Sequence, residues 1–159
     1  MSKETEKIAA LQEENRLLKE ELAEYKQIVK DVSAPIIPSI IPETILVPIT
    51  GKLSQDRFET IISSLMNACY ENEVETVIID FTAISKKEIG ETPVLGQSID
   101  HLINSLNLMG AETFLVGFTP DFTQDLMRSG MRIRTDLNTF LTFRSALQFL
   151  MKKKGMVLA

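Results

Sequence analysis

Over the first 32 residues, apolar side chains recur at alternating intervals of three and four, which is the a/d pattern of a coiled coil. Glu14 and Glu21 fall at g positions, and Lys19 and Lys26 fall at the following e positions, so parallel helices in register would pair them between chains. Residues 1–32 are therefore predicted to form a parallel dimeric coiled coil. Its expected seam contains Ile8, Leu11, Asn15, Leu18, Leu22 and Tyr25.

Asn15 occupies an a position of this seam. A buried amide at such a position fixes the register and favours two strands, at some cost in stability. An isolated helix of this length is marginal in water, so its apolar stripe needs a partner. The alternative to a homodimer is a single amphipathic helix that folds onto the rest of the chain.

Residues 33–43 contain three prolines and separate this helix from the rest of the chain. Pro35, Pro38 and Pro42 are excluded from a helix interior and favour extended conformations in the residues before them. We predict a semi-rigid linker. The isoleucines between the prolines indicate that the linker packs along a surface.

Residues 44–154 alternate short apolar runs with amphipathic segments. The runs at 44–49, 76–81, 113–118 and 138–141 predict strands, and Pro48 favours an edge position for the first of them. Helices are expected between the strands and over residues 143–153, which predicts an α/β domain with a partly parallel sheet. Residues 155–159 are expected to form a tail.

Three hydroxyl residues mark expected helix starts. Ser54 is a capping residue, while Thr92 and Thr119 each precede a proline, which suits the first helical position. Gly110 and Gly130 are expected to end the helices that begin at these two threonines.

The totals exclude several classes of function. A net charge of −5 argues against a nucleic-acid surface, and the only basic run, residues 152–154, suits the end of a helix. No apolar run reaches the roughly 18 residues of a membrane span, and the N-terminus lacks a signal-peptide pattern. The single cysteine excludes an intramolecular disulfide and suits a reducing compartment. We expect a cytoplasmic protein that binds neither nucleic acid nor membrane.

Few residues offer catalytic or ligating chemistry, so we expect no enzymatic activity, cofactor or metal site. His101, the only histidine, is predicted at the surface, and Cys69 lies on the apolar stripe of a predicted helix, as a core residue would. A catalytic pair of the two would need a third group and a cleft. Asp80, at the end of a predicted strand, is either a site carboxylate or an acceptor for the amides of the following turn.

Several short segments, taken in order, resemble the STAS domain of stressosome co-antagonists (RsbR-like proteins), a family of anti-sigma-factor antagonists. The resemblance covers about residues 33–150 and implies a STAS domain over residues 44–154, with a mixed four- to five-stranded sheet covered by helices. The segments are SAPIIP at 33–38, LVPITGKL at 46–53, CYE at 69–71, VIIDFT at 77–82, LMGAE at 108–112, GFTP at 117–120, TF at 139–140 and AL at 146–147.

This resemblance implies a non-enzymatic switch in bacterial stress signalling. Members of the family assemble with other STAS proteins into stressosomes. A partner serine/threonine kinase phosphorylates a Ser or Thr at the start of the second helix and sometimes a Thr in the third. Phosphorylation changes whether the kinase or an anti-sigma factor stays bound.

The chain departs from the family in the loop before the second helix. Asp80 and Thr82 match the family's Asp-x-Thr, but an alignment without a gap places Glu88 where the phospho-acceptor is expected. A longer loop places Glu91 and Thr92 there instead, or Thr92 and the proline after it. We prefer this alignment because Thr92 is the expected helix cap, which makes Thr92 the phosphorylation candidate.

A second departure lies in the expected third helix, where Asp125 occupies the position of the family's second threonine. Asp125 is either a permanently acidic replacement for a phosphorylated residue or an ordinary solvated side chain. A coiled coil also stands where the family carries a sensor domain. Two other functions remain open: a structural adaptor that is not phosphorylated, and a sensory STAS domain that binds a small molecule or nucleotide.

Overall fold

The computed structural model describes residues 2–32, 35–91, 94–132 and 137–156. The chain divides into an N-terminal helix and a compact domain, each described here by itself. The helix, α1, spans Lys3–Val32 and buries none of its residues within the single chain. This confirms the helix expected over residues 1–32. Its exposed apolar residues include Ile8, Leu11, Leu18, Leu22 and Tyr25, each 53–63% exposed.

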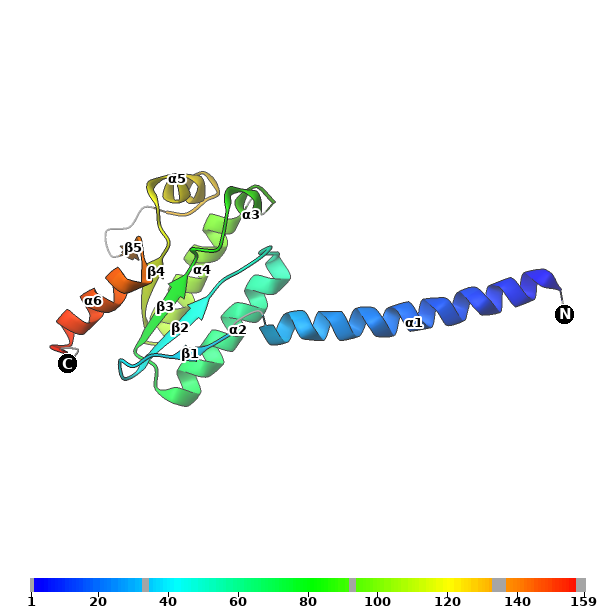
Figure 1. The fold of residues 1–159 in the computed structure, drawn as a ribbon, viewed down its shortest axis with the longest axis horizontal. Helices are drawn as coiled ribbons and strands as arrows, with labels where there is room; N and C mark the ends of the chain where they lie inside the picture. The colour runs from blue at the N-terminus through cyan, green and yellow to red at the C-terminus, as the bar shows by residue number, and fades with distance from the viewer. Residues whose placement is uncertain (1, 33–34, 92–93, 133–136, 157–159) are drawn as a thin grey trace. The chain divides into compact units, whose positions relative to one another are not determined.

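The compact domain is built on one mixed five-stranded sheet in the order β1-β2-β3-β4-β5 (Figure 1). Its short first strand is antiparallel to the second, and the other neighbouring pairs are parallel. This confirms the expected fold class. The strands are β1 Ile37–Pro38, β2 Thr44–Pro48, β3 Thr76–Asp80, β4 Glu112–Val116 and β5 Asn138–Phe140.

Helices cover both faces of this sheet, which explains why β3 and β4 are apolar almost throughout. On one face, Val77, Ile79 and Leu115 share a core with apolar residues of α2, α4 and α5. On the other face, Ile78 and Phe114 share a second core with α6. The helices are α2 Gln55–Asn72, α3 Lys86–Glu91, α4 Leu95–Leu108, α5 Pro120–Arg128 and α6 Phe143–Lys153.

Part of the predicted linker belongs to the sheet. Ile37 and Pro38 form β1 and pair with Leu46 and Ile45, so β1 and not β2 is the edge strand. The physical reason is that a residue before proline favours an extended backbone, while the missing N–H of proline is tolerated at an edge. The expectation that this segment packs is confirmed, because Ile41 is fully buried.

Two of the three expected helix caps are confirmed. The Ser54 hydroxyl accepts a hydrogen bond from the N–H of Arg57 at 3.2 Å, and Thr119 caps α5, which opens with Pro120. The expectation for α4 is wrong, because that helix begins at Leu95 with Val94 at its N-cap position. Thr92 and the proline after it lie outside the described residues.

The unexpected helix α3 occupies part of the loop before α4. A helix start can be recognised in Ser85-Lys86-Lys87-Glu88, which has the spacing of a capping box. The N–H of Ser85 donates to Oε2 of Glu88 at 2.8 Å. This local bond favours a helical turn at Lys86, so the stretch predicted as a loop contains a short helix.

Candidate functional site

The turn that leaves β3 is held by Asp80 and Thr82. Oδ1 of Asp80 accepts hydrogen bonds from the N–H of Thr82, at 2.8 Å, and from the Thr82 hydroxyl. Of the two interpretations of Asp80, the structure therefore shows the turn acceptor. Gly117 follows β4 with a φ of +88°, and a Cβ there would lie 2.7 Å from the N of Thr82. The turns after β3 and β4 therefore lie directly against each other.

Glu88, which an alignment without a gap places at the acceptor position, is engaged inside α3. Its carboxylate accepts hydrogen bonds from the hydroxyl and the N–H of Ser85, and these lower the pKa of Glu88. The buried side chain of Ile84 anchors the chain just before this helix. Glu91 is the last residue of α3. Glu88 is thus a capping carboxylate in this structure.

Asp125 lies on α5, which contacts both α3 and α4. Its side chain is 21% exposed, and Oδ1 lies 3.5 Å from Nη1 of Arg128. Asp125 is therefore a partly covered helix residue that lies beside a cation. Whether it replaces a phosphorylated threonine remains a proposal.

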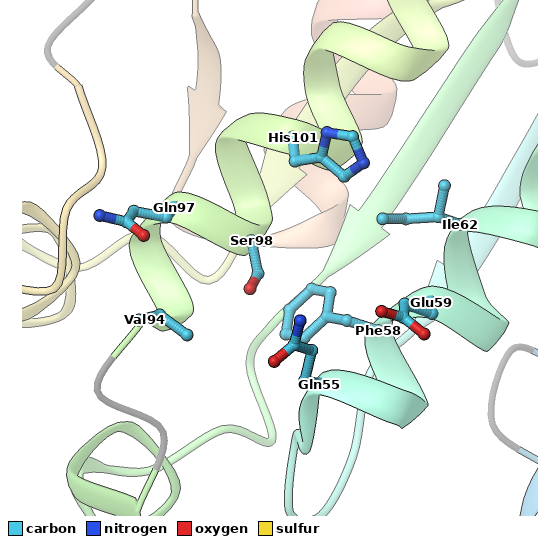
Figure 2. Close-up of a pocket in the computed structure, with 8 residues that line it drawn as sticks. All are labelled: Gln55, Phe58, Glu59, Ile62, Val94, Gln97, Ser98 and His101. Carbon is cyan, nitrogen blue, oxygen red and sulfur yellow. The ribbon is translucent and has the colours of Figure 1, made fainter.

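Between α2 and α4 the surface carries a hollow of about 380 Å³ (Figure 2). Phe58 and Ile62 are the buried residues that line it, while His101 is exposed, as the sequence predicted. Ser98, from the first turns of α4, points toward Gln55 and Phe58 of α2 across this hollow, whereas the side chain of Gln97 points away from α2. The hollow therefore adjoins the start of α4, close in sequence to Thr92.

Cys69 is buried in the core and does not line this hollow. Burial raises the pKa of the Cys69 thiol, which keeps it protonated and unreactive. This agrees with its expected role as a core residue. Within the described residues, no group of three or more His, Cys, Asp or Glu side chains is arranged to hold a metal ion. No described helix is long and apolar enough to span a membrane.

The sites predicted in the domain therefore gather where β3 and β4 end. Asp80 ends β3, Thr82 and Glu88 lie on the chain between β3 and α4, and Asp125 lies on the adjoining helix α5. We call this region, residues 80–91 with α5 and the first turn of α4, the switch surface. The six predicted seam residues lie instead on α1, Ile8 to Tyr25.

Sequence reasoning missed one residue of the switch surface, Ser85, and one that directly follows α5, Ser129. Ser85 could have been found from its spacing to Glu88. Ser129 could not, because its hydroxyl bonds to Gly96, which lies 33 positions away in the chain.

No family model matches this sequence. Among curated proteins, the RsbT co-antagonist protein RsbRB of Bacillus subtilis is 28% identical over 130 residues, which cover 79% of this chain and 45% of that protein. A blue-light photoreceptor of Listeria innocua is 29% identical over 122 residues, which cover 76% of this chain and 46% of the photoreceptor. The chain thus spans less than half the length of these relatives.

Solved structures share the fold. A subunit from a structure of the stressosome superposes with a TM-score of 0.64 and 18% identity, covering 77% of this chain and all of its own length. A single-residue variant of RsbS from Moorella thermoacetica gives a TM-score of 0.61 and 18% identity, covering 77% of this chain and 98% of RsbS. The domain therefore has the STAS fold, and the resemblance to stressosome co-antagonists is confirmed.

Proposed function

We propose that this STAS-domain protein, related to the RsbT co-antagonists, is a non-enzymatic scaffold of a bacterial partner-switching system. It would act in the cytoplasm, assemble with other STAS proteins and bind a serine/threonine switch kinase or an anti-sigma factor. The observation that carries the proposal is the match to RsbRB, which spans most of this chain and includes the region of the switch surface. A relative named as a co-antagonist of RsbT supports regulation by binding and not by catalysis.

The switch surface suits regulation by a phosphate. It combines a turn ordered by Asp80, a short helix held by Glu88 and the first turn of α4. A helix N-terminus favours negative charge, so a phosphate just before α4 would be held there. It would also add nearly two negative charges to this surface. Thr92 is the acceptor that we propose.

The proposal is tested by incubating the full-length chain with its cognate kinase and ATP, followed by mass spectrometry. We expect phosphate on Thr92 in the wild type, retained in Thr92→Ser and lost from that position in Thr92→Ala. Phosphate only at other residues would refute Thr92 as the switch. A chain that binds the kinase but is never phosphorylated would favour the structural adaptor.

Asp125 provides a second, independent test. We propose that it keeps its position on α5 permanently acidic, although one carboxylate only partly imitates a phosphate. Asp125→Thr and Asp125→Ala should both change the affinity for the kinase, as measured by calorimetry. Arg128→Ala is the matched control, because it removes the neighbouring cation and leaves the carboxylate in place. Equal binding by the wild type and both Asp125 variants would refute this role.

A further inference from the structure

At the start of α4, the residue in the N-cap position offers no acceptor for the first N–H groups of the helix. Val94 holds the N-cap position, and its side chain accepts no hydrogen bond. The first N–H groups of a helix have no partner within the helix, and a side-chain oxygen at the N-cap normally bonds the second or third of them. Gly96 is the second residue of α4, so its N–H is one of these groups.

Ser129, directly after α5, supplies an acceptor for the N–H of Gly96. Its hydroxyl accepts a hydrogen bond from the N–H of Gly96 at 2.9 Å and donates to the carbonyl of Leu126 at 2.9 Å. Its own N–H donates to the carbonyl of Asp125 at 3.1 Å. A continuous path of hydrogen bonds thus joins the first turn of α4 to the backbone of Asp125, the proposed acidic replacement for a phosphorylated threonine.

The contact is close because position 96 is a glycine. A Cβ there would collide with the carbonyl oxygen of Leu126 and the backbone nitrogen of Met131. One turn further along α4, the carboxylate of Asp100 accepts a hydrogen bond from the N–H of Arg132 at 2.8 Å. The end of α5 therefore lies directly on the first two turns of α4.

We infer that Ser129 of the same chain caps the start of α4 in place of an N-cap side chain, and that this hydrogen bond couples the start of α4 to α5. A negative group placed before α4 would compete with the Ser129 hydroxyl for the N–H of Gly96, and α5 would be released from α4. Ser129 is thus a positioning residue. Through it, a negative charge just before α4 changes the packing of α5, the helix that carries Asp125. This role in signalling rests on the proposed function.

The experiment uses the purified chain without any kinase. It therefore tests the coupling through Ser129 independently of whether a kinase phosphorylates the protein, which is the test of the proposed function. Val94→Asp places a carboxylate at the N-cap, while Val94→Ala is its control without an oxygen. Amide hydrogen exchange is measured for Gly96 and for Gly130 and Met131, whose N–H groups bond within the end of α5.

Ser129→Ala should speed the exchange of Gly96 about fivefold, the worth of one typical hydrogen bond. Ser129→Thr should largely preserve its protection. Ser105→Ala is the control, because it removes a hydroxyl that bonds a backbone carbonyl elsewhere on α4. Unchanged protection of Gly96 in Ser129→Ala would overturn the cap.

The coupling is tested by combining the two sites. Val94→Asp should speed the exchange of Gly130 and Met131, whereas Val94→Ala should leave both unchanged. The loss of melting temperature caused by Ser129→Ala should be at least halved in the Val94→Asp background and fully retained in the Val94→Ala background. Equal losses in all backgrounds, with α5 equally protected, would overturn the coupling, because independent sites add.

Discussion

Ser85 and Glu88 close the first turn of α3, where the N–H of Ser85 donates a hydrogen bond of 2.8 Å to Oε2 of Glu88. The Ser85 hydroxyl donates to the same oxygen. Glu88 is therefore committed to the local structure of the switch surface, although an alignment without a gap would place it at the phospho-acceptor position.

Replacing Glu88 by Gln should destabilise α3, because a neutral amide accepts weaker hydrogen bonds than a carboxylate. These bonds lower the pKa of Glu88, so their stabilising contribution is present above the ordinary carboxyl pKa and is lost as the pH falls through the lowered value. The melting temperature of Glu88→Gln should therefore lie below that of the wild type at neutral pH and approach it in acid. A difference that is constant with pH would contradict this account.

Replacing Glu43 by Gln should stabilise the domain at neutral pH. Its hydrogen bond with Glu75 and the repulsion between the two groups raise the pKa of Glu43. A raised carboxyl pKa means that the folded state favours the protonated form, so stability is lost as the pH rises through that value. The melting temperature of Glu43→Gln should exceed that of the wild type at neutral pH and match it in acid. Glu59→Gln, on α2, is the control for the loss of one negative charge from the domain.

Replacing Glu73 by Gly should also stabilise the domain. Glu73 is the C-cap of α2, in a left-handed conformation with a φ of 50°. Glycine adopts this conformation without strain, so we expect a gain of about 0.5–1 kcal/mol and a melting temperature about 1–4 °C higher. Ser63→Gly, within the same helix, should instead cost a similar amount. A loss of stability in Glu73→Gly would contradict the role of backbone strain here.

The seam of α1 predicts a dimer. Removing residues 1–32 should lower the mass measured by light scattering, because the seam is exposed in the single chain. Asn15→Leu should broaden the range of oligomers, since the amide no longer selects a two-stranded register. Ala10→Leu places the same side chain outside the seam and should leave the oligomer unchanged. If the truncated chain kept the full-length stoichiometry, the coiled coil would be wrong or redundant.

Local patterns were enough to predict most of the fold. The period of α1, the four strands from β2 to β5 and the caps Ser54 and Thr119 all depend on residues within a few positions of one another. The same holds for Asp80, whose bond to Thr82 spans two positions. Such signals are complete within a short stretch of sequence, so the sequence by itself determined them.

Contacts between distant segments decided the rest. The edge strand β1 depends on pairing with Leu46, although its own prolines suggest only an extended linker. The start of α4 was misjudged because its sequence offers Thr92 as a local cap, whereas the helix begins at Leu95. The N–H of Gly96 bonds to the hydroxyl of Ser129, 33 positions further along the chain. A hydrogen bond of this kind forms only when α5 packs on α4, because its two residues are far apart in the chain. No local pattern around Ser129 can therefore predict that Gly96 is its partner.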